Sequence, residues 1–155
     1  MDYIEGHTTE PGCLFCNRLG MEDGLDNLIL YRGEKVFTIL NRYPYTNGHM
    51  MVVPYEHTAT LESLDNAVQL ELMNMTAAAI GILRSAYGAE AFNVGINIGE
   101  AAGAGIAEHI HIHIVPRWSG DTNFMATTAA SRVLPESLKV TYSKLRDCWR
   151  SLNEA

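Results

Sequence analysis

The chain has 155 residues, 47% of them hydrophobic and 19% charged, which suits one domain with one core. Its net charge of −7 argues against a protein built to grip a nucleic-acid backbone. No apolar run approaches the roughly 20 residues of a membrane span, and the amino terminus does not resemble a signal peptide. Three cysteines, with one close pair, do not suit a disulfide framework, so the expected setting is a reducing cytoplasm.

Short apolar runs bounded by Gly and Pro predict strands, and a long stretch of 3.6-residue spacing predicts a helix. In chain order the expected elements are a polar tail (1–12), a hairpin (28–32 and 35–40), a strand stopped at Pro54 (49–53), a helix (63–87), two strands (91–98 and 109–115) and a helix (135–152). Ser63 or Asp65 is expected to cap the long helix, Gly88 to end it, and Pro135 to start the last one. Strands in hairpin-like runs around one long helix favour an α+β class with a mainly antiparallel sheet.

The segment from His109 to His113 is the most informative part of the chain, because three of the six histidines alternate there with isoleucine. Side chains of a strand alternate between faces, so the three imidazoles are expected to share one face. A solvent-facing strand surface usually carries Thr, Lys, Glu or Arg instead. The pattern therefore predicts either a metal site or nucleophilic catalysis by the central imidazole.

The segment HIHIHIV followed by PRW resembles the signature of the histidine triad (HIT) family of nucleotide hydrolases and transferases. The segments LNRYPYTNGHMMVVPYEH and FNVGINIGEAAGAGIAEH resemble the nucleoside-binding strand–loop–strand of that family and its phosphate-side strand and loop. The resemblance covers about residues 13–120. It implies a single HIT-like domain over residues 1–155, with a helical extension at about 135–152.

The resemblance implies a two-step transfer at the α-phosphate of a dinucleoside polyphosphate such as diadenosine tetraphosphate. His111 would attack the phosphorus and form a nucleotidyl-histidine intermediate, which water or another acceptor releases. A backbone carbonyl near His109 would fix the tautomer of His111, and His113 would assist the leaving group. Because an unperturbed imidazole has a pKa of about 6.5, activity is expected to fall as the pH drops through that range.

Nucleotide contacts are also implied by the resemblance. Asn41 matches the ribose-side Asn of the family, Asn97 stands where relatives contact phosphate, and His49 belongs to the family's Gly-His pair. The alternative for each of these side chains is a structural role. Backbone amides of Gly103 and Gly105 are expected to approach phosphate.

Two segments indicate which subgroup of the HIT family the chain resembles. Relatives carry Gln and Ser or Thr just before the triad, where this chain has Gly105 and Ile106, so side-chain contacts to phosphate are not expected there. The tail PRWSGDTNFM resembles bacterial relatives of diadenosine polyphosphate hydrolases and phosphorylases. Trp118 and Asn123 are expected near the second nucleoside, and a dimer or core contact is the alternative for Trp118.

Cys13 and Cys16 have the spacing that lets two thiolates reach one tetrahedral metal. In one branch of the superfamily that the chain resembles, zinc is held by such a pair, by a His after the second strand's Pro and by the first triad His. These are His57 and His109 here. A structural zinc site is therefore expected, against the alternative of two reduced core cysteines, whereas Cys148 is expected to pack.

Other functions stay open at this point. A phosphorolytic nucleotidyltransferase and a nucleoside phosphoramidate hydrolase differ only in acceptor or substrate, whereas a nucleotide-binding scaffold would show no turnover. No organic cofactor, nucleic acid or membrane partner is expected. The family is commonly homodimeric through the long helix and an edge strand, and Met73, Met75 and Ile80 could form an apolar face for this contact.

Overall fold

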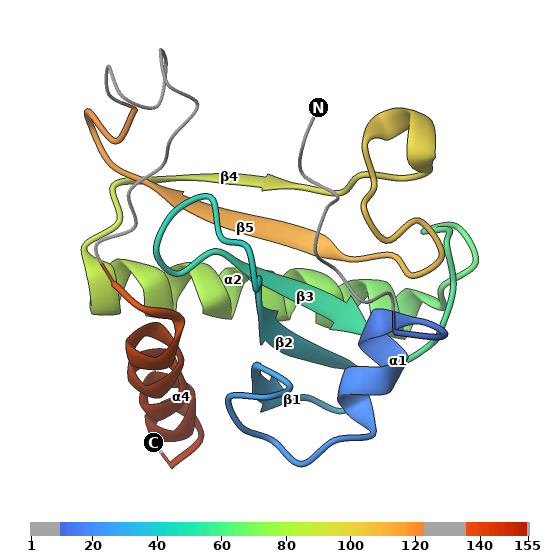
Figure 1. The fold of residues 1–155 in the computed structure, drawn as a ribbon, viewed down its shortest axis with the longest axis horizontal. Helices are drawn as coiled ribbons and strands as arrows, with labels where there is room; N and C mark the ends of the chain where they lie inside the picture. The colour runs from blue at the N-terminus through green and yellow to red at the C-terminus, as the bar shows by residue number, and fades with distance from the viewer. Residues whose placement is uncertain (1–9, 123–135, 155) are drawn as a thin grey trace.

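A five-stranded sheet organises the chain (Figure 1). The structure is a computed structural model that describes residues 10–122 and 136–154. The strands are β1 (Ile29–Arg32), β2 (Val36–Leu40), β3 (Met50–Pro54), β4 (Ala91–Gly95) and β5 (Ile112–Arg117), in the order β1-β2-β3-β5-β4. All four neighbouring pairs of these strands are antiparallel. The expected α+β class is therefore confirmed.

Helices flank this sheet. They are α1 (Leu14–Leu19), α2 (Asn66–Tyr87), the single 3₁₀ turn η1 (Glu100–Ala102) and α4 (Leu138–Glu154). α2 lies behind the sheet in Figure 1 and packs on β2, β3 and β5 through its buried stripe, because its apolar residues recur at helical spacing. Within the described ranges no helix is both long and apolar enough to cross a membrane.

The helix boundaries differ from the predicted ones at their starts. Asp65 is the residue before α2, but its side chain makes no capping hydrogen bond, and the Ser63 hydroxyl is hydrogen-bonded to Thr58 and Thr60 in the preceding turn, so neither predicted side chain caps the helix. Gly88 ends α2 in the left-handed conformation, with φ of 59°. α4 starts three residues after the predicted position, and Pro135 lies outside the described residues, as does most of the polar tail. α1 was not predicted.

The strands that carry the site are shorter at one end than predicted. β5 starts at Ile112, so His109 and His111 precede it, and β4 ends at Gly95 instead of residue 98. The chain diverges from the ladder before β5, since the Ile110 N–H donates to the carbonyl of Thr58 at 2.7 Å. β4 therefore loses its partner beyond the Gly95–His113 pair. Pro54, predicted to stop β3, is its last residue and pairs with Val36, because a strand end tolerates a missing N–H.

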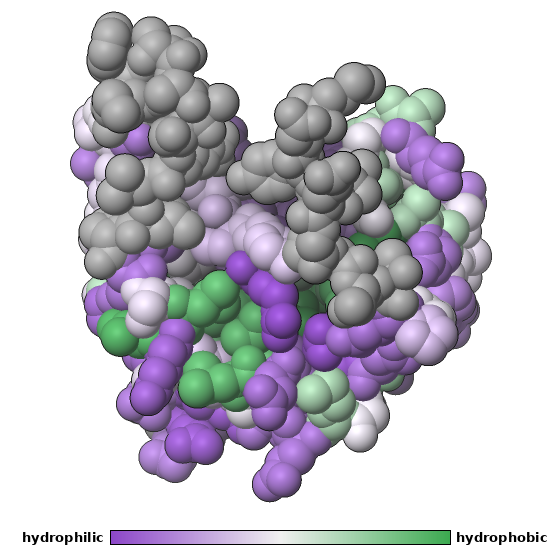
Figure 2. Space-filling model, in the orientation of Figure 1, coloured by the Kyte–Doolittle hydropathy of each residue, from purple (hydrophilic) through white to green (hydrophobic). Residues whose placement is uncertain are grey.

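The two faces of the sheet have different covers. The register aligns Ile39, Met51, His113 and Gly95 in one row across β2, β3, β5 and β4. Opposed residues share a face, and α2 covers the face that buries Ile112 and Ile114 on β5. His113 therefore stands on the other face, which is called the site face below. In the orientation of Figure 1, Figure 2 shows a hydrophobic patch left of and below the centre of this face, bordered by hydrophilic residues.

α4 covers the outer edge of β1. The Tyr142 hydroxyl donates to the Ile29 carbonyl at 3.0 Å, and Arg146 Nη1 donates to the Leu30 carbonyl at 2.6 Å. The buried Trp149 ring stacks on Tyr31, with centroids 5.2 Å apart. These contacts occupy backbone groups that an edge strand otherwise offers to another chain. The opposite edge of the sheet, β4, is mostly exposed.

Candidate active site and metal centre

The ring of His111 is held by the backbone of its own segment. Its Nδ1 lies 2.8 Å from the carbonyl oxygen of His109, which can only accept, so Nδ1 carries the ring proton. Nε2 then keeps its lone pair, which is the nucleophilic form of a neutral imidazole. His111 is buried against Phe15, with ring centroids 5.0 Å apart, and burial lowers its pKa below 6.5. The ring is therefore neutral at pH 7.

A chain of hydrogen bonds sets the tautomer of His113. The Tyr45 N–H donates to His49 Nδ1 at 3.2 Å, so the proton of a neutral His49 is on Nε2. That Nε2–H donates to His113 Nδ1 at 3.0 Å, which leaves the His113 proton on Nε2. Burial lowers the pKa of His113 to about 4. His113 is thus a neutral donor, and its ring centroid lies 4.8 Å from that of His111.

The loop between β2 and β3 supports this chain of bonds. The ring of Tyr45 covers His49, with centroids 4.8 Å apart. Asn41 Nδ2 lies 3.3 Å from His49 Nε2, while its Oδ1 accepts the Tyr43 N–H at 3.0 Å. Asn41 therefore has the structural role that is its alternative, because its oxygen caps the turn, and its Nδ2 also lies beside His49. Tyr45 was not predicted, and only its position in the same loop as His49 could have indicated it.

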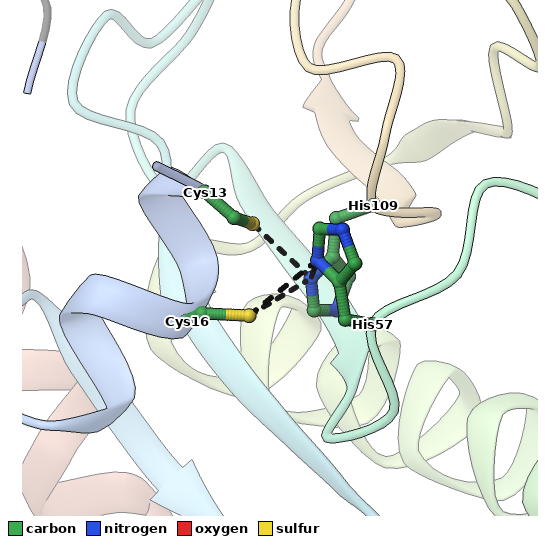
Figure 3. A group of neighbouring side chains, drawn as sticks. All are labelled: Cys13, Cys16, His57 and His109. Atoms are coloured by element: carbon green, nitrogen blue, oxygen red, sulfur yellow. Dashed lines mark hydrogen bonds between the residues drawn. The ribbon is translucent and has the colours of Figure 1, made fainter. Parts of the chain in front are cut away.

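Four side chains from three segments meet beside the triad (Figure 3). Cys13 and Cys16 come from the start of α1, His57 from the turn after β3 and His109 from the segment before β5. Their ligand atoms all lie within 4.8 Å of one another. His109 Nδ1 is 3.3 Å from Cys13 Sγ and 3.7 Å from Cys16 Sγ. His57 Nδ1 is 3.5 Å from Cys16 Sγ and 3.3 Å from His109 Nδ1.

Four of the six distances between ligand atoms fit the edges of a zinc tetrahedron. With Zn–S and Zn–N bonds of about 2.3 and 2.05 Å, neighbouring ligand atoms should lie about 3.3 Å apart for N and N and about 3.5 Å for N and S. The tautomer of His109 also suits a metal ligand. Its Nε2 lies 2.8 Å from the Pro54 carbonyl oxygen, which can only accept, so the ring proton is on Nε2. Nδ1 therefore turns a lone pair toward the two sulfurs, as a metal-binding histidine does.

Four other predicted residues lie on the loop after β4 or just after β5. Asn97, Gly103 and Gly105 are exposed on the loop after β4, and Gly103 has φ of 82°. Trp118 follows β5 and is half-buried, and its indole N–H donates to the Tyr87 carbonyl at 3.2 Å. That bond ties the end of β5 to the end of α2. Asn123 lies outside the described residues.

A family model for the HIT domain matches residues 23–120. The chain belongs to the HIT family. The solved structures similar to this HIT chain include a Zn-bound histidine triad family protein from Mycobacterium smegmatis, with a TM-score of 0.73 and 27% identity over 92% of this chain and 96% of that one. A histidine triad nucleotide-binding protein from Sulfolobus tokodaii gives the same TM-score and identity over 91% and 94%. The predicted HIT-like fold is confirmed.

Curated relatives carry enzyme names. A protein named AP-4-A phosphorylase from Mycobacterium tuberculosis is 43% identical over 124 residues, which are 80% of this chain and 64% of that protein. An asymmetrical bis(5'-nucleosyl)-tetraphosphatase from Schizosaccharomyces pombe is 28% identical over 60% of this chain and 50% of that protein. The HIT chain thus matches less than two thirds of the length of either relative.

Proposed function

We propose that this HIT protein transfers a nucleotidyl group from a dinucleoside polyphosphate, such as diadenosine tetraphosphate, through His111. The observation that carries the proposal is the bond between His111 Nδ1 and the His109 carbonyl, because it leaves the nucleophilic lone pair on Nε2. The names of the M. tuberculosis and S. pombe relatives support the substrate class. The whole chain is taken as one HIT domain, with α4 as an extension beyond the matched residues.

The reaction has two displacement steps. In the first, His111 Nε2 bonds to the α-phosphorus, and the bond from phosphorus to the bridging oxygen breaks. The departing oxygen keeps the electron pair, and the neutral His113 ring donates a hydrogen bond from Nε2–H to it. In the second step an acceptor oxygen bonds to the same phosphorus and the bond from phosphorus to His111 Nε2 breaks. Nε2 keeps the electron pair, so the ring returns to its neutral form, and any proton of the acceptor passes to solvent.

Substrate contacts come from the loops around the triad in this proposal. Backbone amides of Gly103 and Gly105 and the side chain of Asn97 would hold the α-phosphate. Asn41 would contact the ribose, with His49 behind it as the support of His113. Trp118, whose N–H is bonded within the protein, would offer only its ring to a second nucleoside.

The acceptor is decided by product analysis with diadenosine tetraphosphate, with and without inorganic phosphate. The 43% identity to AP-4-A phosphorylase favours phosphate as the acceptor, which predicts ADP and ATP that appear only when phosphate is present. AMP and ATP formed without phosphate would instead identify a hydrolase. If the protein cleaved only nucleoside phosphoramidates, these would replace dinucleoside polyphosphates as the substrate class. Nucleotide binding without any turnover would contradict the enzymatic proposal.

We infer that the cluster of Cys13, Cys16, His57 and His109 binds structural zinc. Two thiolates and two imidazole nitrogens are a donor set that zinc prefers, and the M. smegmatis neighbour is described as Zn-bound. The ion would join α1 to the segment that carries the nucleophile. It would supply no group to the reaction.

A homodimer through β4 and α2 is the oligomer that the surface favours. Leu70 and Met73 on α2 are 62% and 61% exposed, and Val94 on β4 is 45% exposed. Met75 belongs to the core instead, at 9% exposure, so only part of the expected apolar face is available. A solution mass of two chains checks this proposal.

The cytoplasm is the proposed compartment, since the thiolate ligands require reducing conditions.

The pH profile follows from the two buried imidazoles. The pKa of His111 is lowered by burial, and that of His113 is lowered to about 4. Both rings are neutral above their pKa, so kcat/KM should stay constant from pH 8 to below 6.5 and fall only at lower pH. The fall in kcat/KM is thus expected at a lower pH than it would be if the nucleophile were an exposed imidazole. A rate that rises toward pH 5 would contradict the role of His111.

A further inference from the structure

β4 presents small residues on the site face, with Asn93 as the polar one, and larger apolar residues on the other face. Phe92 and Val94 share the face of α2, since the Arg84 guanidinium of α2 lies 5.1 Å from the centre of the Phe92 ring. Because strand side chains alternate, Asn93 and Gly95 stand on the site face with His113. This half of the face is exposed, so it is open to a ligand.

The register places Asn93 close to the proton donor. Gly95 is directly opposite His113, and Asn93 is opposite Val115. Asn93 is therefore a diagonal neighbour of His113, at a Cα distance of about 7–8 Å. A Cβ built at Gly95 would meet no heavy atom within 4 Å, so the space beside His113 is open.

Two further side chains fix the orientation of the Asn93 amide. Asp121 accepts hydrogen bonds from Arg117 Nε and Nη2 at 2.6 and 2.8 Å. The remaining terminal nitrogen of Arg117, Nη1, donates to Asn93 Oδ1 at 2.8 Å. With its oxygen bound to Arg117, Asn93 turns the two N–H groups of Nδ2 away from that guanidinium. None of the hydrogen bonds between described residues uses Nδ2 of Asn93, so its two N–H groups are available to a ligand on the same face as Gly95.

The other half of the site face is closed. Phe15 of α1 packs on Phe37 of β2, with ring centroids 6.5 Å apart, and the row neighbours Ile39 and Met51 are buried. An extended phosphate chain whose scissile bond lies at His111 and His113 can therefore continue over β4, past Gly95.

We propose that Asn93 binds the phosphates beyond the scissile bond and so selects substrates by the length of the phosphate chain. The inference rests on the proposed function, because it assumes that the α-phosphate is attacked by His111. Asn93 is the residue that contacts substrate, and Arg117 is a positioning residue that keeps the amide oxygen away from the phosphates. Amide donors suit this task because phosphate oxygens only accept hydrogen bonds.

The test compares two substrates in the Asn93→Asp variant. Aspartate keeps the shape of the side chain and can pair with Arg117, so the fold is retained, but it loses both donors. With diadenosine tetraphosphate, kcat/KM is expected to fall by about ten-fold or more, as for a lost hydrogen bond to a charged group. With adenosine 5′-phosphorimidazolide, which has no phosphate beyond the α-phosphate, kcat/KM is expected to stay at the wild-type value.

Two variants complete the design. Asn93→Ala removes the donors without adding charge and should show the same substrate-dependent loss, and Asn66→Ala removes an exposed Asn at the start of α2 as a matched control. Equal losses on both substrates, or no loss on either, would overturn the role of Asn93. A wild-type protein that turns over neither substrate would instead overturn the proposed function, and this inference with it.

Discussion

His111→Gly is expected to lower the turnover of diadenosine tetraphosphate by about 10³-fold or more, the scale seen when a covalent nucleophile is removed. The reason is that Nε2 of His111 forms the bond to phosphorus, whereas the groups assigned to substrate binding stay in place. Nucleotide affinity should therefore change little. Single-turnover rates at saturating substrate, together with a binding titration, separate the two effects.

Adenosine 5′-phosphorimidazolide provides the positive control for the same variant. This compound has the phosphorus–imidazole bond of the expected intermediate, and the missing side chain leaves room for its imidazole. His111→Gly should transfer AMP from it to the acceptor, because only the first step has been removed. His113→Gly keeps the nucleophile but lacks the donor, so it is the matched comparison at the neighbouring imidazole. If His111→Gly used neither substrate, or still cleaved the tetraphosphate at the wild-type rate, the covalent route would be wrong.

Local patterns predicted the elements whose stability is local or periodic. The 22 residues of α2 repeat apolar side chains often enough to define a helix and its buried stripe. α1 has only six residues, too few for a period, and short isolated helices are unstable in water. Its position depends on Phe15, which packs against His109 and His111 from a distant part of the chain. The sequence alone contains no sign of that contact.

The residues of the site also differ in whether local sequence patterns could predict them. The triad and the Cys13–Cys16 pair use residue types at short, recognisable spacings, so the sequence could indicate them, whereas His57 was indicated as a ligand only by the resemblance to the family. The tautomer of His113 depends on His49, which lies 64 residues away in sequence and reaches it only because β3 pairs with β5. The place of Asn93 depends likewise on the register of β4 against β5. Register between distant strands is set by the whole sheet, so neither partner could be found from spacing.

Cys16→Ser is expected to lower the zinc content well below one ion per chain and to lower Tm by on the order of 10 °C. A hydroxyl is a much poorer zinc ligand than a thiolate, and Cys16 is the exposed cysteine of the cluster, so its replacement leaves the packing of the core intact. Metal analysis of protein purified without chelator, and thermal unfolding of the same samples, measure both effects.

The chain offers a matched control in Cys148→Ser, since Cys148 is a reduced, half-buried cysteine on α4 that lies outside the cluster. That variant should keep its zinc. Loss of the ion should also reduce activity, because the ring of His109 would be released while its carbonyl is the acceptor that fixes His111. Chelation of the wild type should then reproduce both the lower Tm and the lower kcat, and added zinc should restore them. Two results together would contradict the zinc site: wild-type protein that contains no zinc when purified, and a Tm that does not change when chelator is added. The four side chains would then hold no structural metal.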